Sequence, residues 1–280
     1  MIRWEVRGQV AVATLERPER RNALHAPGCD QLRRYLEDAD GVRAVVLTGA
    51  GSAFCAGADL GTRFDLAHSE APGHSEALKG SGSHEPGGEW HEQRRDTFRP
   101  AFEGLLDALG ALPAPVIAAV HGPAIGAGTQ LAVACDIRVA DDRARFGIPA
   151  GKLGIHLHWT NIQRLVQLVG PGPARDLLLT SRTIGVDEAE RMGLVDRRAD
   201  DALAAALEVA DEIATLAPLT VAGHKHALEL ISERGGLRPG TDDDAIAAID
   251  ADEERAFASD DLRIGMEAFA AKTRPEFEGH

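Results

Sequence analysis

Short apolar segments, separated by helical patterns, fill most of the first 200 residues. Residues 44–47 and 116–120 are apolar at every position, which is typical of strands buried on both faces of a sheet. Residues 3–7 and 10–15 flank a Gly-Gln turn and predict a β-hairpin, and residues 137–140 predict a further strand. With the helices between them, these strands predict the α/β class.

Apolar residues at helical spacing predict helices over residues 27–39 and 98–112. The run Thr160-Asn161-Ile162-Gln163 has the pattern of a capping box, so we expect a helix to open there and to run to about residue 169. Pro173 is predicted to start the next helix, because proline is favoured in a first helical turn.

The pattern changes after about residue 200, where no further strand is predicted. Residues 203–213, 217–233 and 243–269 all have helical spacing. We therefore predict a core over residues 1–200 and a C-terminal helical region over residues 201–280.

Residues 61–95 are rich in Gly, Ser, His and Glu and poor in apolar side chains, so they can bury little surface. We predict a mobile insert in the core. Its four histidines have spacings that fit no standard set of metal ligands, and no metal site is expected: His68, His74, His84 and His91.

Composition excludes several classes of function. The formal net charge of −14 argues against a nucleic-acid partner, because basic surfaces supply that affinity. The three cysteines are widely spaced, which favours reduced thiols and a cytoplasmic location. The N-terminus has no apolar signal segment, and no stretch approaches the roughly 20 apolar residues of a membrane span.

Two glycine-rich turns carry the candidate chemistry, and each directly follows an apolar strand. They are residues 48–60 (TGAGSAFCAGADL) and residues 121–130 (HGPAIGAGTQ). Such turns present backbone N–H groups, and two that converge would form an oxyanion hole that polarises a carbonyl group. The first turn lacks the third glycine of a dinucleotide fingerprint. Cys55 is either a nucleophile beside these donors or a small buried residue, and the second interpretation is favoured.

Several blocks, in order along nearly the whole chain, resemble the crotonase (enoyl-CoA hydratase/isomerase) superfamily. They are AVVLTGAGSAFCAGADL, PVIAAVHGPAIGAG with LAVACDIRVA, ARFGIPAGKLGI, LVGPGPARDLLLTSRTIGVDEAERMGLVD and GMEAFAAKTRPEFEGH. The resemblance implies a spiral of ββα units with a C-terminal helical trimerisation region. It also implies a homotrimer or hexamer, and a coenzyme A thioester as ligand with no further cofactor.

The resemblance also implies roles for individual residues. The backbone N–H groups of Ala58 and Ala127 fall at the oxyanion positions. Arg20 and Arg21 either contact the CoA phosphates or form a solvated turn. The full set of residues implied for CoA binding is Arg20, Arg21, Ala23, Ala56, Asp59 and Leu60, with Phe269 and Lys272 reaching the CoA of a neighbouring subunit.

Two positions depart from the pattern of the hydratases. Family hydratases use two glutamates, but the corresponding residues here are Gln130 and Ala150. An amide and a methyl group transfer no proton near neutral pH, and the loss of one acid–base group costs about 10²–10⁴ in rate. We therefore expect little or no hydration activity.

His158 and His156 are candidate replacements, because both lie in a stretch that departs from the family's usual glycine-rich pattern. His158 falls at or near a position where a dehalogenase-like branch carries a catalytic carboxylate, and it precedes a predicted helix. The alternative is that one or both imidazoles are hydrogen-bonded in the pocket wall.

The segment HGPAIGAGTQLAVACD also resembles an actinobacterial branch that lacks both glutamates and binds long acyl-CoA esters without turnover. Three hypotheses follow. The leading one is an acyl-CoA-binding protein of lipid metabolism. The others are an isomerase or hydrolase that uses His158 or His156, and a purely structural trimer.

Overall fold

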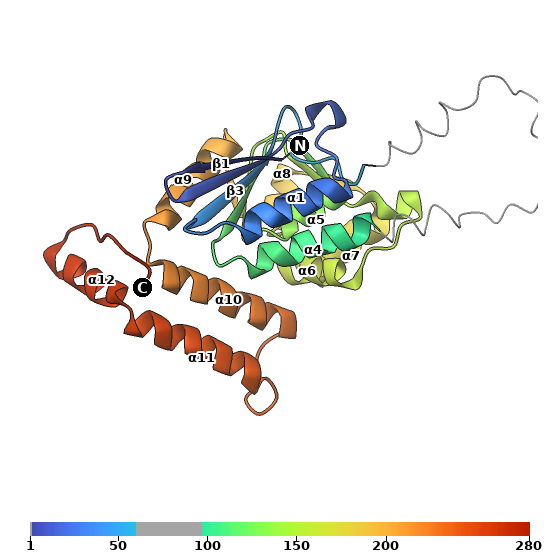
Figure 1. Ribbon diagram of the computed structural model, residues 1–280. Helices are drawn as coiled ribbons and strands as arrows, with labels where there is room; N and C mark the ends of the chain where they lie inside the picture. Colours follow the sequence, from blue (N-terminus) through green and yellow to red (C-terminus); the bar gives the residue numbers. More distant parts are fainter. Residues whose placement is uncertain (1, 60–96) are drawn as a thin grey trace, which may run out of the picture.

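The computed structural model describes residues 2–59 and 97–280, so Leu60 and the predicted insert lie outside the described residues. The described strands form two sheets (Figure 1). The larger has six strands in the order β1-β2-β3-β4-β6-β9, and only the β1–β2 pair is antiparallel. These strands are β1 Ile2–Arg7, β2 Val10–Leu15, β3 Ala44–Gly49, β4 Val116–Val120, β6 Ile137–Ala140 and β9 Arg197–Arg198.

The second sheet was not predicted. Its strands β5 Pro123–Ile125, β7 Arg145–Gly147 and β8 Thr183–Gly185 have three residues each, too few to show a strand period. Strand β5 lies inside the second glycine-rich turn. A single bridge pairs Cys55 of the first turn with Ala124 of β5, so this small sheet connects the two turns.

Helices cover both faces of the large sheet, and neighbouring residues of a strand therefore face two different cores. Val45 and Leu47 of β3 pack into the larger core. Its helices are α1 Ala26–Glu37, α4 Phe98–Ala111, α5 Ala127–Val133, α6 Trp159–Val169, α7 Pro171–Thr180 and α8 Val186–Arg191. Ala44 and Val46 pack on the other face, against α9 Ala202–Ala214. This arrangement explains the unbroken apolar pattern of β3 and β4.

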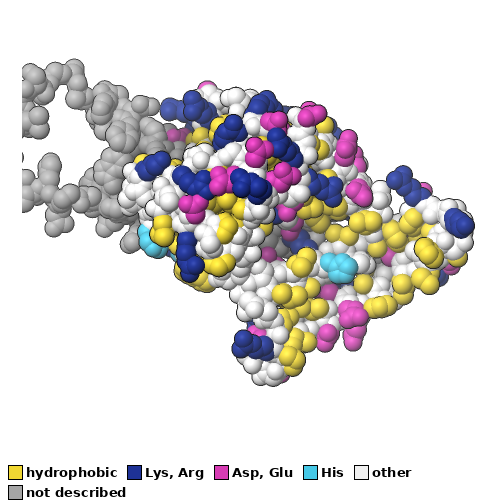
Figure 2. Space-filling view, turned by 180° about the vertical axis from the view of Figure 1, so that it is seen from behind, with side chains coloured by type: hydrophobic (Ala, Val, Ile, Leu, Met, Phe, Trp, Pro, Cys, Tyr) yellow, Lys and Arg dark blue, Asp and Glu magenta, His cyan; other side chains and the backbone are white. Residues whose placement is uncertain are grey.

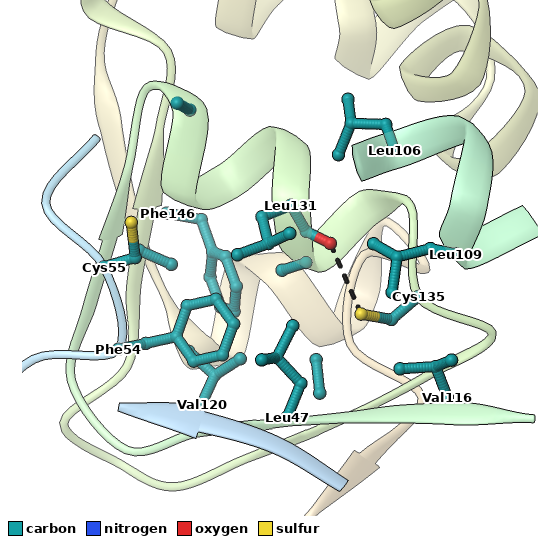
Figure 3. Packing of buried hydrophobic residues seen from close by; sticks show 14 of the residues in the cluster. Leu47, Phe54, Cys55, Leu106, Leu109, Val116, Val120, Leu131, Cys135 and Phe146 are labelled. Atoms are coloured by element: carbon teal, nitrogen blue, oxygen red, sulfur yellow. Dashed lines mark hydrogen bonds between the residues drawn. The ribbon is translucent and has the colours of Figure 1, made fainter. Parts of the chain in front are cut away.

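Figure 3 shows the part of the larger core that lies under the glycine-rich turns. Phe54 and Phe146 are fully buried there with Leu47 of β3, Val120 of β4 and Leu131 of α5. The first turn is thus anchored in the core by an aromatic side chain directly before its cysteine.

Two helix starts differ from the sequence prediction. Helix α6 begins at Trp159, with His158 rather than Thr160 as the N-cap residue. The hydroxyl of Thr160 lies 2.7 Å from Nδ1 of His158 instead of capping the helix, so the predicted capping box is wrong. Helix α7 opens at Pro171 rather than Pro173, because Gly170 ends the preceding helix and serves as the N-cap residue of α7.

The last three helices extend away from the sheet (Figure 1). They are α10 Pro218–Arg234, α11 Asp243–Ala258 and α12 Asp260–Ala271, and the predicted run of residues 243–269 is broken at Ser259, whose backbone is extended. Lys225 attaches α10 to the core, since its buried ammonium donates to the carbonyl of Leu109 at 2.8 Å and pairs with Asp136 at 2.9 Å. No helix in the described ranges is long and apolar enough to cross a membrane.

Candidate functional site

The two glycine-rich turns are in direct contact. Gly57 has φ +104°, and a β-carbon there would lie 2.8 Å from the carbonyl oxygen of Ile125 and 3.6 Å from the backbone nitrogen of Ala127. Gly126 has φ +59°, and a β-carbon there would lie 3.9 Å from the Cα of Gly57. Glycine at position 57 therefore permits the close approach of the two backbones, and glycine at position 126 permits the positive φ.

Ala58 and Ala127 lie at this contact, and their neighbours make the local hydrogen bonds. Leu24 N–H donates to Gly57 at 2.7 Å, and Asp59 N–H donates to Leu24 at 2.6 Å, so the N–H of Ala58 points away from this bridge. Ala127 is the first residue of α5, where an N–H has no partner within the helix. In the described part of the chain, neither N–H donates to a backbone carbonyl.

The segment with the predicted CoA-binding arginines lies beside the first glycine-rich turn. The N–H of Ala56 donates to the carbonyl of Arg21 at 2.9 Å. Arg20 ends the short 3₁₀ helix η1 Pro18–Arg20, and the side chains of Arg20 and Arg21 are exposed. Ala23 follows in the same segment. The structure therefore brings Arg20, Arg21, Ala23, Ala56 and Asp59 together.

Two residues that the sequence analysis missed hold this segment. Arg17 pairs with the carboxylate of Asp59 at 2.8 Å and donates to the carbonyl of Ala23, also at 2.8 Å. The side chain of Asn22 is buried and donates to the carbonyls of Ala50 at 2.9 Å and Ala53 at 2.7 Å. The sequence offered one signal for Asn22, because asparagine is among the few residues that tolerate a left-handed backbone. The structure shows that conformation, with φ +58° at Asn22.

Gln130 and Ala150 lie on two different elements. Gln130 is on α5, one helical turn after Ala127, and Ala150 is in the 3₁₀ helix η2 Pro149–Leu153. Gln130 lies beside Val133, Ile148, Asn161, Arg164 and Leu165 at a spot with no room for a water molecule, and no carboxylate of the described residues lines it. The guanidinium of Arg164 is paired with Asp107 at 2.8 Å.

His158 and His156 differ in their surroundings. His158 is partly buried, and its Nδ1 lies 2.7 Å from the hydroxyl of Thr160 and 3.6 Å from Oε1 of Glu103 on α4. The same Glu103 oxygen accepts from Arg99 at 2.7 Å. His156 is exposed, and its Nδ1 contacts the carbonyl of Leu157 at 2.7 Å. Of the two imidazoles, His158 alone has a carboxylate beside it among the described residues.

Cys55 is the small buried residue that the sequence analysis favoured. Its side chain is fully buried, and this burial raises the pKa of the thiol to about 12. The thiolate needed for nucleophilic attack is therefore scarce at neutral pH. A β-carbon on Gly128 would come within 2.1 Å of the Cys55 carbonyl oxygen, which shows how closely α5 packs on this turn.

Phe269 and Lys272 are not near the glycine-rich turns of their own chain. Both belong to the end of α12, which extends away from the sheet (Figure 1). Phe269 is 85% exposed. Figure 2 shows apolar side chains spread over these projecting helices, at the lower right of the view. The most exposed large apolar side chains of α10 to α12 are Leu228, Phe257, Met266 and Phe269.

Known proteins match the chain over nearly its full length. The family model described as Enoyl-CoA hydratase/isomerase matches residues 5–83 and 80–280. A protein named "Probable enoyl-CoA hydratase echA6" from Mycobacterium bovis is 36% identical over 276 residues, which cover 96% of each chain. The "Short-chain-enoyl-CoA hydratase" of Clostridium acetobutylicum is 34% identical over 279 residues, covering 97% of this chain and 95% of that protein.

Solved structures share the fold. The crystal structure of an enoyl-CoA hydratase/carnithine racemase from Magnetospirillum magneticum aligns with a TM-score of 0.81 at 31% identity, over 100% of this chain and 96% of that one. That of an enoyl-CoA hydratase from Bacillus anthracis aligns with a TM-score of 0.81 at 30% identity, over 100% and 99%. The fold expected from the sequence resemblance is therefore confirmed.

Proposed function

Because the chain belongs to the enoyl-CoA hydratase/isomerase family of the crotonase superfamily, we propose that it binds acyl-CoA thioesters of fatty-acid and lipid metabolism and hydrates enoyl-CoA weakly or not at all. One observation carries this proposal. The two glycine-rich turns touch, and among the described residues the N–H groups of Ala58 and Ala127 donate to no backbone carbonyl, while Gln130, an amide, lies one helical turn after Ala127.

The thioester oxygen would accept from the N–H groups of Ala58 and Ala127. A backbone donor needs no particular side chain, so alanine serves at both positions. Each hydrogen bond to a neutral carbonyl contributes about 0.5–1.5 kcal/mol net. Two such bonds favour a thioester over a ligand that lacks the carbonyl, and they also stabilise an enolate if one forms.

Hydration would fail at proton transfer. Adding water to the double bond needs one group to activate water and another to protonate the α-carbon. Gln130 and Ala150 occupy the positions where the family resemblance implies these two groups, and neither side chain titrates. The oxyanion contacts alone supply about 10²–10³ in rate, so a slow residual reaction is compatible with this site.

The CoA moiety would lie along the segment of residues 20–24, with the exposed guanidinium groups of Arg20 and Arg21 at its phosphates. Asp59 would act indirectly, because its carboxylate is paired with Arg17. Phe269 and Lys272 would reach the CoA of a neighbouring subunit. The exposed apolar side chains of α10 to α12 favour burial between subunits, so we propose a homotrimer or a hexamer assembled through residues 201–280.

A binding experiment with two matched ligands tests the proposal. Octanoyl-CoA should bind more tightly than S-octyl-CoA, a thioether with the same chain length and no carbonyl oxygen. In parallel, crotonyl-CoA hydration should be at or near the uncatalysed rate. Efficient hydration, or no binding of butyryl-, octanoyl- or palmitoyl-CoA, would contradict the proposal, and the second outcome would favour a structural role.

A second candidate function rests on His158. Its Nδ1 lies beside Glu103 and Thr160, so these two residues orient the ring, and an oriented imidazole is the commonest general base. The reaction would start with transfer of the α-proton of the thioester to Nε2 of His158, which leaves an enolate at the two N–H groups. Isomerisation of an enoyl thioester would finish with return of that proton to the γ-carbon. Hydrolysis would start differently, with His158 taking a proton from the water that attacks the thioester carbon, after which the CoA thiolate leaves and takes up the proton. Exchange of the α-proton with deuterium in D₂O separates this function from binding alone.

A further inference from the structure

We propose that Arg17 is a positioning residue for the thioester contact, although it does not itself reach the thioester. Through Asp59 and the carbonyl of Ala23, it joins the segment of Arg20 and Arg21 to the first glycine-rich turn, which carries the N–H of Ala58. This inference rests on the proposed binding of acyl-CoA. It adds that the nucleotide contact and the carbonyl contact are made by one rigid unit.

The guanidinium of Arg17 makes both connections at once. One nitrogen, Nη2, pairs with Oδ2 of Asp59 at 2.8 Å, and the other, Nη1, donates to the carbonyl of Ala23 at 2.8 Å. The side chains of Arg17 and Asp59 are 18% and 4% exposed, so water competes little for their ion pair. The planar fork of arginine can hold both acceptors in fixed directions, whereas the single ammonium of lysine cannot.

The segment needs such a connection because its backbone is strained. Arg21 and Asn22 are consecutive residues other than glycine with positive φ, +48° and +58°. Such conformations persist only where surrounding contacts hold them. Asn22 provides part of this support through Ala50 and Ala53, and its Oδ1 accepts from the N–H of Arg17 at 3.0 Å. Arg17 is therefore connected to the strained pair by its backbone as well.

Backbone hydrogen bonds connect the two segments in register. Ala56 donates to Arg21, Leu24 to Gly57, and Asp59 to Leu24. Ala58 lies between the last two of these contacts, and its own N–H is directed by their geometry. A shift of Asp59 away from Leu24 would turn the adjacent peptide and misdirect that N–H. The preference of the site for a thioester over a ligand without the carbonyl would therefore depend on Arg17.

The test compares Arg17→Lys with a matched control, Arg138→Lys. Arg138 is also buried, and its guanidinium contacts the carbonyl of Cys135 at 2.6 Å and the carboxylate of Asp196 at 2.6 Å. It lies on β6, on the other side of the sheet centre. The measured quantity is the ratio of the Kd for S-octyl-CoA to the Kd for octanoyl-CoA. We expect Arg17→Lys to lower this ratio by roughly 2–13-fold, the equivalent of one hydrogen bond. Arg138→Lys should leave the ratio unchanged while lowering the melting temperature.

Amide hydrogen exchange gives an independent measurement on the same variants. Arg17→Lys should speed exchange at residues 57–59 more than at residues 126–128, and Arg138→Lys should affect neither. A folded Arg17→Lys protein that keeps both the ratio and the exchange rates of the wild type would overturn the inference. An equal weakening of both ligands would also overturn it, because that result indicates a structural role only.

Asp59→Asn serves if Arg17→Lys does not fold, since the amide keeps the shape and one acceptor. Asp59→Asn should also lower the ratio of the Kd for S-octyl-CoA to the Kd for octanoyl-CoA. An unchanged ratio would refute the role of the Arg17–Asp59 pair. A wild-type protein that binds neither ligand is a different result. It removes the proposed function itself, and with it this inference.

Discussion

The imidazole of His158 lies with Nδ1 3.6 Å from Oε1 of Glu103, across the interface between the start of α6 and helix α4. The hydroxyl of Thr160 lies 2.7 Å from the same nitrogen. Because both partners approach Nδ1, Nε2 is the nitrogen left to act on a ligand. This pairing was not apparent from the sequence, in which Glu103 and His158 are 55 positions apart.

This relationship predicts different effects at the two histidines. If the protein exchanges the α-proton of octanoyl-CoA in D₂O, His158→Asn should slow that exchange by about 10²–10⁴ with little change in Kd. His156→Asn is the matched control, and it should leave the exchange rate unchanged because its ring is exposed. NMR of the recovered ligand measures the exchange. The reverse ranking of the two variants would assign the base to His156, and absence of exchange in the wild type would remove the second candidate function.

Restoring the two carboxylates should create a hydratase. We expect Gln130→Glu combined with Ala150→Glu to raise crotonyl-CoA hydration by about 10²–10⁴, measured by the loss of ultraviolet absorbance of the enoyl thioester. Gln9→Glu, which adds the same group at an exposed hairpin turn, should have no effect. A folded double variant that binds acyl-CoA but remains inactive would show that more than proton transfer is missing.

Removing one donor of the proposed oxyanion hole should weaken thioester binding specifically. Ala58→Pro deletes the N–H, so the affinity for octanoyl-CoA should fall by roughly 2–13-fold while that for S-octyl-CoA changes less. The melting temperature is the control for local unfolding. If the folded variant keeps its full preference for the thioester, the carbonyl is bound elsewhere.

Glu229 of α10 should make stability depend on pH. Burial, followed by the negative charge of Glu233, raises the pKa of its carboxyl group above the usual glutamate value. A carboxyl whose pKa is higher in the folded state favours folding when protonated, and this contribution is lost as pH rises through the folded-state pKa. Glu229→Gln should therefore raise the melting temperature at pH 7 and change it little at pH 4. An equal gain at both pH values would mean that ionisation is not the cause.

Long elements could be predicted and short ones could not. Strands β2, β4 and β6 and helices α1 and α4 each carry an apolar pattern that their own residues display. Strands β5, β7 and β8 are too short for any pattern, and they form because the two turns are brought together. The start of α6 was misplaced because Thr160 has two possible partners, and the structure pairs it with His158.

The sequence by itself determined the α/β class and the crotonase-like fold. Those properties depend on residue type and order, which local patterns and family blocks report directly. Only the tertiary structure decided that Arg17 pairs with Asp59, that His158 faces Glu103 and that Cys55 is fully buried. Such pairings depend on which distant segments share a low-dielectric interior, and the spacing of residues along the chain does not encode that.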